Sequence, residues 1–208
     1  SVSEINLIDP INKFSSGWEG YLMDRRKKTS AEKYDYFVDK EHDVYKLFIK
    51  SIPSLFDKVI DKDEYKTKSS LGQTRISAIP WICIFNEKIT ESAQHGFYIS
   101  YLFSNNAKQL YLSIGIAAKQ FDDLYSGSKC TSKIKEARIK FENLFDHYKP
   151  LESFQKIKLL DEKDSNFIKN KKEYIGKSMQ RILDYEAGCL FTKKHTSYLL
   201  APISSPTP

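Results

Sequence analysis

A short acidic segment followed by a lysine is the first feature with possible catalytic chemistry. The triplet Glu64–Lys66 follows Asp61 and Asp63, which imitates the acidic-x-Lys element of metal-dependent nucleases. Such a site also needs a separate aspartate on a neighbouring strand to hold the metal ion. A chain rich in Glu and Lys produces these triplets by chance. A nuclease that uses Asp61, Glu64 and Lys66 is therefore an alternative hypothesis rather than the preferred one.

Two further patterns imitate catalytic motifs without completing them. Gly176–Ser178 reads Gly-Lys-Ser, as at the end of a phosphate-binding P-loop, but the glycine required five positions earlier is replaced by Lys171. No nucleophile, base and orienting acid stand out together. The four histidines have no spacing typical of metal ligands, and they are His42, His95, His147 and His195. We therefore expect no catalytic residue, no bound metal and no cofactor.

The remaining candidate is a binding surface rich in hydroxyl, basic and aromatic side chains. A polar loop at residues 61–80 leads into Trp81, and Tyr98 and Leu102 lie on one face of a later predicted strand. Core packing is the alternative interpretation of Trp81 and Leu102. The loop side chains and backbone amides could contact phosphates or base edges. These loop residues are Lys66, Lys68, Ser69, Ser70, Gln73, Thr74 and Arg75.

The composition is that of a basic globular domain, which fits a polyanionic partner, although many basic proteins bind nothing anionic. The 208 residues carry a net charge of +6, and 13 Tyr and 13 Phe offer rings on which bases can stack. No apolar run approaches a membrane span, so we expect a cytoplasmic location and no membrane partner. The cysteines are Cys83, Cys130 and Cys189, and their wide spacing favours free thiols in a reducing compartment.

Hydrophobic periodicity predicts the elements that would position this surface. Residues 81–85, 97–103 and 110–116 are predicted strands, and the short connection at residues 104–109 predicts a hairpin turn between antiparallel neighbours. Residues 154–160 could form a further strand. Short connections of this kind predict strands that are adjacent in one sheet.

Helices are predicted on both sides of these strands. A capping box at Thr29–Glu32 predicts a helix start, and Ile52–Pro53 predicts a break between two short helices. Residues 132–148 read as an amphipathic helix. Residues 164–183 carry a basic helical pattern that includes Arg181, either as a solvated face or as a face for the DNA backbone.

Residues Tyr65–Ile116 resemble the N-terminal domain of McrB-like proteins, the DNA-recognition part of modification-dependent restriction systems. The resemblance combines a Ser-x-Gly loop, a Pro-Trp pair before an apolar strand and a characteristic aromatic spacing. A late element near the C-terminal end also looks similar. The residues that carry it are Ser70–Gly72, Ile79–Phe85, Gly96–Tyr98, Leu102, Leu110–Gly115 and Tyr185–Phe191.

The resemblance implies a fold and a domain division. The fold class is α+β (mixed α/β), with a central mixed or antiparallel sheet flanked by helices. Residues 1–28 would be an N-terminal extension, residues 29–195 the DNA-recognition domain, and residues 196–208 a linker or end segment. The GTPase motor that drives such systems and the nuclease subunit would be separate partners.

The resemblance also implies that a modified cytosine is flipped out of double-stranded DNA into a pocket. Trp81 and Leu102 would line this pocket, and Tyr98 would lie beside the base or wedge into the vacated stack. Gln73 stands where a compared family member has an aromatic residue, so it offers amide hydrogen bonds in place of a ring face. The base could be 5-methylcytosine, a hydroxymethylated form, another modification or none. A protein-interaction domain of a defence complex is the other alternative.

Overall fold

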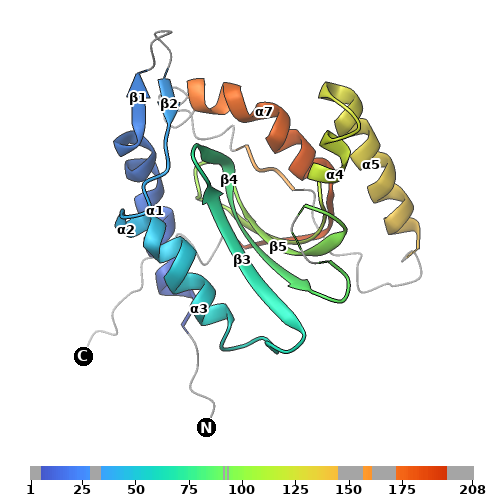
Figure 1. Ribbon diagram of the computed structural model, residues 1–208, viewed down its shortest axis with the longest axis horizontal. Helices are drawn as coiled ribbons and strands as arrows, with labels where there is room; N and C mark the ends of the chain where they lie inside the picture. The colour runs from blue at the N-terminus through green and yellow to red at the C-terminus, as the bar shows by residue number, and fades with distance from the viewer. Residues whose placement is uncertain are drawn as a thin grey trace.

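The computed structural model describes residues 6–28, 34–90, 92, 94–144, 157–160 and 172–195. At its centre lies a five-stranded sheet in the order β3-β4-β5-β6-β7, in which every neighbouring pair is antiparallel (Figure 1). Helices flank this sheet, which confirms the predicted α+β class with its antiparallel alternative. The strands are β3 Tyr65–Gly72, β4 Ile76–Asn86, β5 Phe97–Phe103, β6 Leu110–Ile116 and β7 Cys189–His195.

The predicted strands at 81–85, 97–103 and 110–116 are confirmed. In the expected loop at 61–80, the short strand considered possible at Tyr65–Ser69 is confirmed as part of β3, and the rest is mostly a hairpin. β3 and β4 meet at a tight turn in which Gly72 has a φ of +98°. A Cβ atom at this position would lie 2.0 Å from the carbonyl oxygen of Arg75. Only glycine fits this backbone, and the turn lets β4 begin at Ile76.

One face of the sheet packs against the N-terminal helices. These are α1 Ile8–Asp24, α2 Asp43–Lys46, a π-helical turn at Leu47–Ser51 and α3 Ile52–Phe56. Phe14 of α1 lies 4.4 Å from Phe48 and 5.2 Å from Phe103, measured between ring centroids. The indole nitrogen of Trp18 donates to the carbonyl oxygen of Asn105 at 2.8 Å. Residues 8–24, expected within an N-terminal extension, therefore contribute to the same core as the sheet.

Two helix predictions in this half are wrong. The capping box at residues 29–32 lies outside the described residues, but Tyr34–Tyr36 is strand β2, which pairs with β1, Arg26–Lys28. The first helix after β2 begins at Asp43, where the ring Nδ1 of His42 accepts from the backbone N–H of Val44 at 3.1 Å. Histidine is not among the residues preferred at a helix N-cap, which are Ser, Thr, Asp and Asn, so the sequence pattern did not predict this cap.

The predicted break at Ile52–Pro53 is also absent, because the helical path continues through the π turn into α3. Proline lacks a backbone N–H and is tolerated in the first turn of a helix, where Pro53 lies. The π turn before Pro53 accommodates the missing backbone N–H of this proline. The chain therefore stays helical from Asp43 to Phe56.

The C-terminal helices lie over the other face and one side of the sheet (Figure 1). They are α4 Lys119–Asp122, α5 Gly127–Asn143 and α7 Lys172–Ala187. Both predicted basic or amphipathic helices exist, with shifted bounds. The described residues 157–160 form no strand, and residues 154–156 and 196–208 lie outside the described part.

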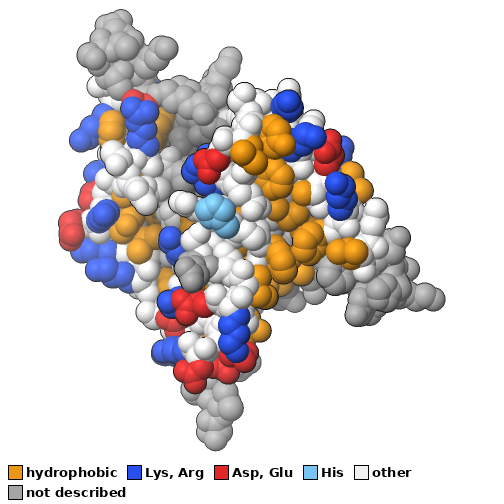
Figure 2. All heavy atoms as spheres, turned by 45° about the vertical axis from the view of Figure 1, so that its right-hand side comes forward, with side chains coloured by type: hydrophobic (Ala, Val, Ile, Leu, Met, Phe, Trp, Pro, Cys, Tyr) orange, Lys and Arg blue, Asp and Glu red, His pale blue; other side chains and the backbone are white. Residues whose placement is uncertain are grey.

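Apolar side chains also reach the surface beside α4 and α5. Figure 2 shows them as a band on the face turned forward, with Lys and Arg side chains near it. Around α4 and α5, the exposed large hydrophobic residues are Leu124, Ile139 and Leu144. None of the helices in the described ranges has the length and apolarity needed to cross a membrane.

Candidate functional site

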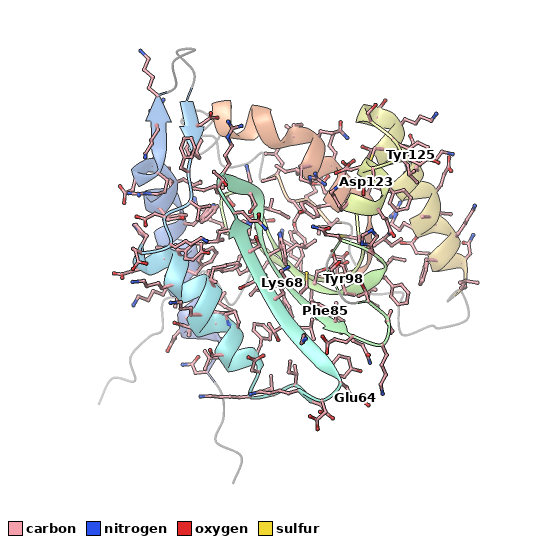
Figure 3. All side chains as sticks on the ribbon, viewed as in Figure 1. Glu64, Lys68, Phe85, Tyr98, Asp123 and Tyr125 are labelled. Atoms are coloured by element: carbon pink, nitrogen blue, oxygen red, sulfur yellow. The ribbon has the colours of Figure 1, made fainter. Side chains whose placement is uncertain are left out.

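A cavity of about 340 Å³ lies on the sheet face that α7 covers in part. Figure 3 labels Lys68 of β3 and Tyr98 of β5, which lie below α7 in that view. Residues from all five strands of the sheet, from α4 and α7, and from the connections before β4 and β5 line the cavity. They include Lys68, Ser70, Gln73, Ser77, Trp81, Cys83, Gln94, Tyr98, Ser100, Leu102, Lys119, Arg181, Tyr185 and Cys189.

Strand register places the cavity floor in rows. Ser70 pairs with Trp81, and Trp81 pairs with Leu102 across the next strand boundary. Directly paired residues of antiparallel strands point to the same face of the sheet. The three side chains therefore form one row across β3, β4 and β5, and all three line the cavity.

A second row runs beside the first. Lys68 pairs with Cys83, and Cys83 pairs with Ser100. These residues stand two positions away from the first row, so the period-two alternation of strands returns them to the cavity face. The row with the Trp81 indole and the Leu102 side chain therefore lies next to the row with the Lys68 ammonium, the Cys83 thiol and the Ser100 hydroxyl.

The structure brings all four residues of the predicted pocket to this one cavity. Trp81 and Tyr98 are half-buried, Leu102 is only 4% exposed, and Gln73 is exposed in the turn between β3 and β4. Trp81 is therefore not sealed in the core, although it packs against a buried cluster that includes Leu102. This arrangement leaves an aromatic surface open to a ligand.

The residues predicted to contact DNA divide between the two faces of the sheet. Lys68 and Ser70 line the cavity. Lys66 is exposed and forms an ion pair with Glu87. Ser69 faces the helical layer, where its hydroxyl donates to the carbonyl oxygen of Phe48 at 3.0 Å. Neighbours in the sequence thus reach opposite faces of β3.

Thr74 and Arg75 lie outside the cavity, in the exposed turn between β3 and β4. The carbonyl oxygen of Thr74 accepts from the backbone N–H of Val38 at 3.0 Å. The guanidinium of Arg75 lies 3.5 Å from a carboxylate oxygen of Asp35, which is 8% exposed. The turn is therefore tied to the segment after β2 while it still presents a cation to solvent.

Tyr98 lies over a glycine on the cavity floor. Its strand partner is Gly115, where a Cβ atom would lie 3.9 Å from Cε2 of the Tyr98 ring and 2.9 Å from Oγ of Ser100. Burial raises the pKa of Tyr98 well above its ordinary value, and the nearby Cys83 side chain raises this pKa further. Burial also raises the pKa of Tyr185 to about 12. Both phenols stay protonated at neutral pH and can donate hydrogen bonds.

A model of the family described as MrcB-like, N-terminal domain, matches residues 26–199. The chain belongs to this family. No curated protein and no solved structure matches the chain. The match begins at strand β1 and extends past β7, so the whole described lining of the cavity lies inside the MrcB-like domain.

The charged lining of the MrcB-like domain includes two cations that the sequence analysis did not assign to the pocket. Lys119 forms an ion pair with Asp123, and Arg181 forms one with Asp122. The sequence placed Arg181 in a basic helix, but Arg181 lies about a hundred residues after Trp81, so nothing in the sequence indicated that the two residues share a cavity. Tyr185 belonged to the late element of the resemblance, which was the available signal for its position.

The nuclease motif does not form a recognisable metal centre. Asp61, Asp63 and Glu64 are exposed, and the Oδ1 atom of Asp61 accepts from the backbone N–H of Asp63 at 3.0 Å. Lys66 is engaged with Glu87. These contacts are those of a polar turn at the start of β3.

Ligand atoms that could hold a metal do converge elsewhere in the described part, at Asp122, Cys130 and Asp184. Asp122 pairs with Arg181, and Asp184 accepts from the hydroxyl of Thr131 at 2.7 Å. The Cys130 thiol donates to a carboxylate oxygen of Asp122 at 3.2 Å, and burial together with the two nearby carboxylates raises the pKa of this thiol to about 12. This group therefore acts as a hydrogen-bond cluster joining α4, α5 and α7.

Proposed function

We propose that this MrcB-like domain is the DNA-binding specificity domain of a modification-dependent restriction system, acting in the cytoplasm. Family membership supports DNA binding and a role in restriction. The observation that carries the finer proposal is the convergence of Trp81, Leu102, Gln73 and Tyr98 on one cavity. We infer that this cavity receives a modified cytosine rotated out of the duplex.

Base flipping is energetically reasonable in such a cavity. Extruding a base costs a few kcal/mol of unstacking and unpairing. Stacking of a base on an aromatic side chain contributes about 1–3 kcal/mol, and the half-buried indole of Trp81 offers such a surface. Leu102 lies beside Trp81 on the same sheet face and would add an apolar contact at the edge of the base. Hydrogen bonds from Gln73, Ser70 and Tyr98 would offset the remaining cost.

To distinguish a methylated from an unmodified cytosine, the cavity must exclude wrong bases by its shape, because burial of one methyl group contributes little free energy. Burying a methyl group contributes on the order of 1 kcal/mol. Gly115 has no side chain, so the Tyr98 ring and the Ser100 hydroxyl pack closely over it and fix this wall of the cavity, whose shape would select the modification. Because the ring of Tyr98 lies over this glycine, we place Tyr98 beside the base rather than in the vacated stack.

Residues outside the cavity would supply affinity that does not depend on sequence. Lys66, Thr74 and Arg75 lie at exposed positions on β3 and its turn and could contact phosphates. Such contacts weaken as the salt concentration rises, because phosphate binding releases condensed counterions. Ser69 is excluded from this proposal because its hydroxyl faces Phe48.

The proposed domain recognises DNA and does not cleave it. A GTPase motor domain and a separate nuclease subunit would supply translocation and cleavage. The test is a gel-shift panel of identical duplexes that carry cytosine or adenine modifications at one position. Tighter binding to one or more modified cytosines supports the proposal, and equal binding across the panel contradicts it. Magnesium-dependent cleavage by this chain that is lost in Lys66→Ala would favour the nuclease alternative.

A further inference from the structure

We propose that the cavity prefers a flipped cytosine whose modification carries a negative charge, such as a carboxylate at C5, and that Lys68 determines this preference. The inference rests on the proposed function, since it concerns the same cavity. It goes further by naming the chemistry of the modification and the residue that reads it.

The charge of the lining is the first argument. Among the described residues, the charged side chains that line the cavity are the cations Lys68, Lys119 and Arg181. No carboxylate of the described residues lines it. Lys119 and Arg181 are half-buried and Lys68 is exposed. Three cations around one cavity give it a positive potential, which favours a ligand with negative charge.

Among the residues that the structure describes, Lys68 is the lining cation that forms no ion pair. Lys119 and Arg181 are engaged by Asp123 and Asp122. Lys68 lies on the cavity face of β3, opposite Cys83 and close enough to influence this thiol electrostatically. Its charge is therefore available to a ligand in the cavity.

The position of Lys68 relative to Trp81 is the second argument. Lys68 pairs with Cys83, and Trp81 stands two residues before Cys83 on the same face of β4. Side chains in this diagonal relation are roughly 7–8 Å apart, a span that the four-carbon stem of lysine can bridge. A base stacked on Trp81 would thus present one edge to the Lys68 ammonium.

The polarity of the cavity floor agrees with a polar modification. The cavity has a volume of about 340 Å³, which is within the range of roughly 300–1,000 Å³ for small-molecule sites. Beside the row that contains Trp81, the floor carries the side chains of Lys68, Cys83 and Ser100. A methyl group on this side would leave the ammonium without a partner, whereas a carboxylate would bind it.

The competing explanation is that Lys68 contacts a DNA phosphate at the mouth of the cavity. A phosphate contact adds the same affinity to every duplex, whatever the modification. A contact to the modification adds affinity only for the charged base. The two roles are therefore separable by comparing several bases in one sequence context.

The experiment measures dissociation constants at fixed salt and pH 8 for four duplexes that differ at a single base. That base is cytosine, 5-methylcytosine, 5-hydroxymethylcytosine or 5-carboxylcytosine. We expect wild-type protein to bind the carboxyl form about 10- to 100-fold tighter than the methyl form, as for one charge-assisted hydrogen bond. Lys68→Gln should remove this advantage and change the other three affinities by less than about threefold. Lys68→Arg should retain most of it.

Lys66→Gln is the matched control, because Lys66 lies on the same strand but outside the cavity and pairs with Glu87. It should leave the ratio between carboxyl and methyl forms unchanged. Equal loss across all four duplexes in Lys68→Gln would assign Lys68 to a phosphate and overturn the inference. Wild-type selectivity for methylated over plain cytosine without a carboxyl preference would overturn this inference alone, and equal binding of all four would remove the proposed function as well.

Discussion

Trp81 of β4 and Leu102 of β5 are direct partners in the antiparallel register, and both side chains line the same cavity. Leu102 is almost fully buried, while Trp81 keeps part of its indole exposed. One strand pair therefore presents an aliphatic wall beside an open aromatic surface. This relation supplies the two kinds of contact that a planar, partly apolar ligand needs.

Replacing Trp81 should separate selective from nonselective DNA binding. Trp81→Ala removes the stacking surface, worth about 1–3 kcal/mol per base, so the preference for modified DNA should disappear. Weaker, salt-sensitive binding to any duplex should remain because the basic residues are intact. Trp81→Phe should keep part of the preference. Gel shifts with modified and unmodified duplexes measure both effects, and unchanged selectivity in Trp81→Ala would contradict the assignment.

Gly72 should be essential to the hairpin that carries Lys68 and Gln73. Gly72→Ala places a Cβ atom 2.0 Å from the Arg75 carbonyl oxygen at a φ of +98°, so we expect a loss of more than about 2 kcal/mol in unfolding free energy. Gly20→Ala is the control, since Gly20 is exposed in helix α1 with no neighbouring atom near its Cβ position. Gly20→Ala should raise the free energy of unfolding by about 0.5–1 kcal/mol. Urea denaturation distinguishes the two, and similar effects would refute this account.

Gly115 and Ser100 should be energetically coupled. A Cβ atom at position 115 would lie 2.9 Å from Oγ of Ser100, so Gly115→Ala should destabilise the fold by about 1–3 kcal/mol through overpacking. Ser100→Ala in the same chain removes the clashing atom and should restore most of this loss. A double-mutant cycle on unfolding free energies measures the coupling, and strict additivity would rule out the predicted contact.

Alkaline pH should destabilise the fold through its buried thiols. Burial raises the pKa of Cys189 to about 12, whereas an unfolded thiol ionises near about 8.5. Between these values the unfolded chain binds fewer protons than the folded chain, so the free energy of unfolding falls as pH rises. Below about pH 8.5 this contribution is fully present. Urea midpoints between pH 7.5 and 10.5 should decline less in Cys189→Ala than in the wild type, and parallel declines would contradict the prediction.

The hydroxyl of Thr131 should stabilise the helical layer beside the cavity. It donates to Asp184, which is 2% exposed, at 2.7 Å. Thr131→Val leaves this buried carboxylate with fewer donors and should cost about 1–3 kcal/mol. Thr131→Ser keeps the hydroxyl and should cost less. Ser132→Ala, at the exposed neighbouring position, is the control and should change thermal stability little; an equal effect of the two residues would refute the role.

Several features of the fold followed from local sequence patterns. Apolar alternation located the three central strands, and the short turn at residues 104–109 predicted their antiparallel pairing. The same alternation put Tyr98 and Leu102 on one strand face. The predicted helix start at Thr29–Glu32 was wrong because the group that caps the helix is the ring of His42. The predicted helix break at Pro53 was wrong because a π turn accommodates this proline.

The two faces of β3 could not be predicted from the sequence. Residues 61–80 were interpreted mainly as a loop, so Ser69 and Ser70 were expected to act together. In the strand they point to opposite faces, and only Ser70 reaches the cavity. The turn at Gly72 creates this strand pair, and its geometry depends on contact with the Arg75 backbone.

The sequence by itself determined the basic charge, the free thiols, the central strands and the kinship of the Trp81 region, because these depend on composition and on spacing within single segments. Only the tertiary structure decided that Lys68, Arg181 and Tyr185 share a cavity with Trp81. These residues come from separate strands and from a helix about a hundred residues later. Their proximity depends on strand register and on the packing of α7 against the sheet, which are long-range interactions that local periodicity does not encode.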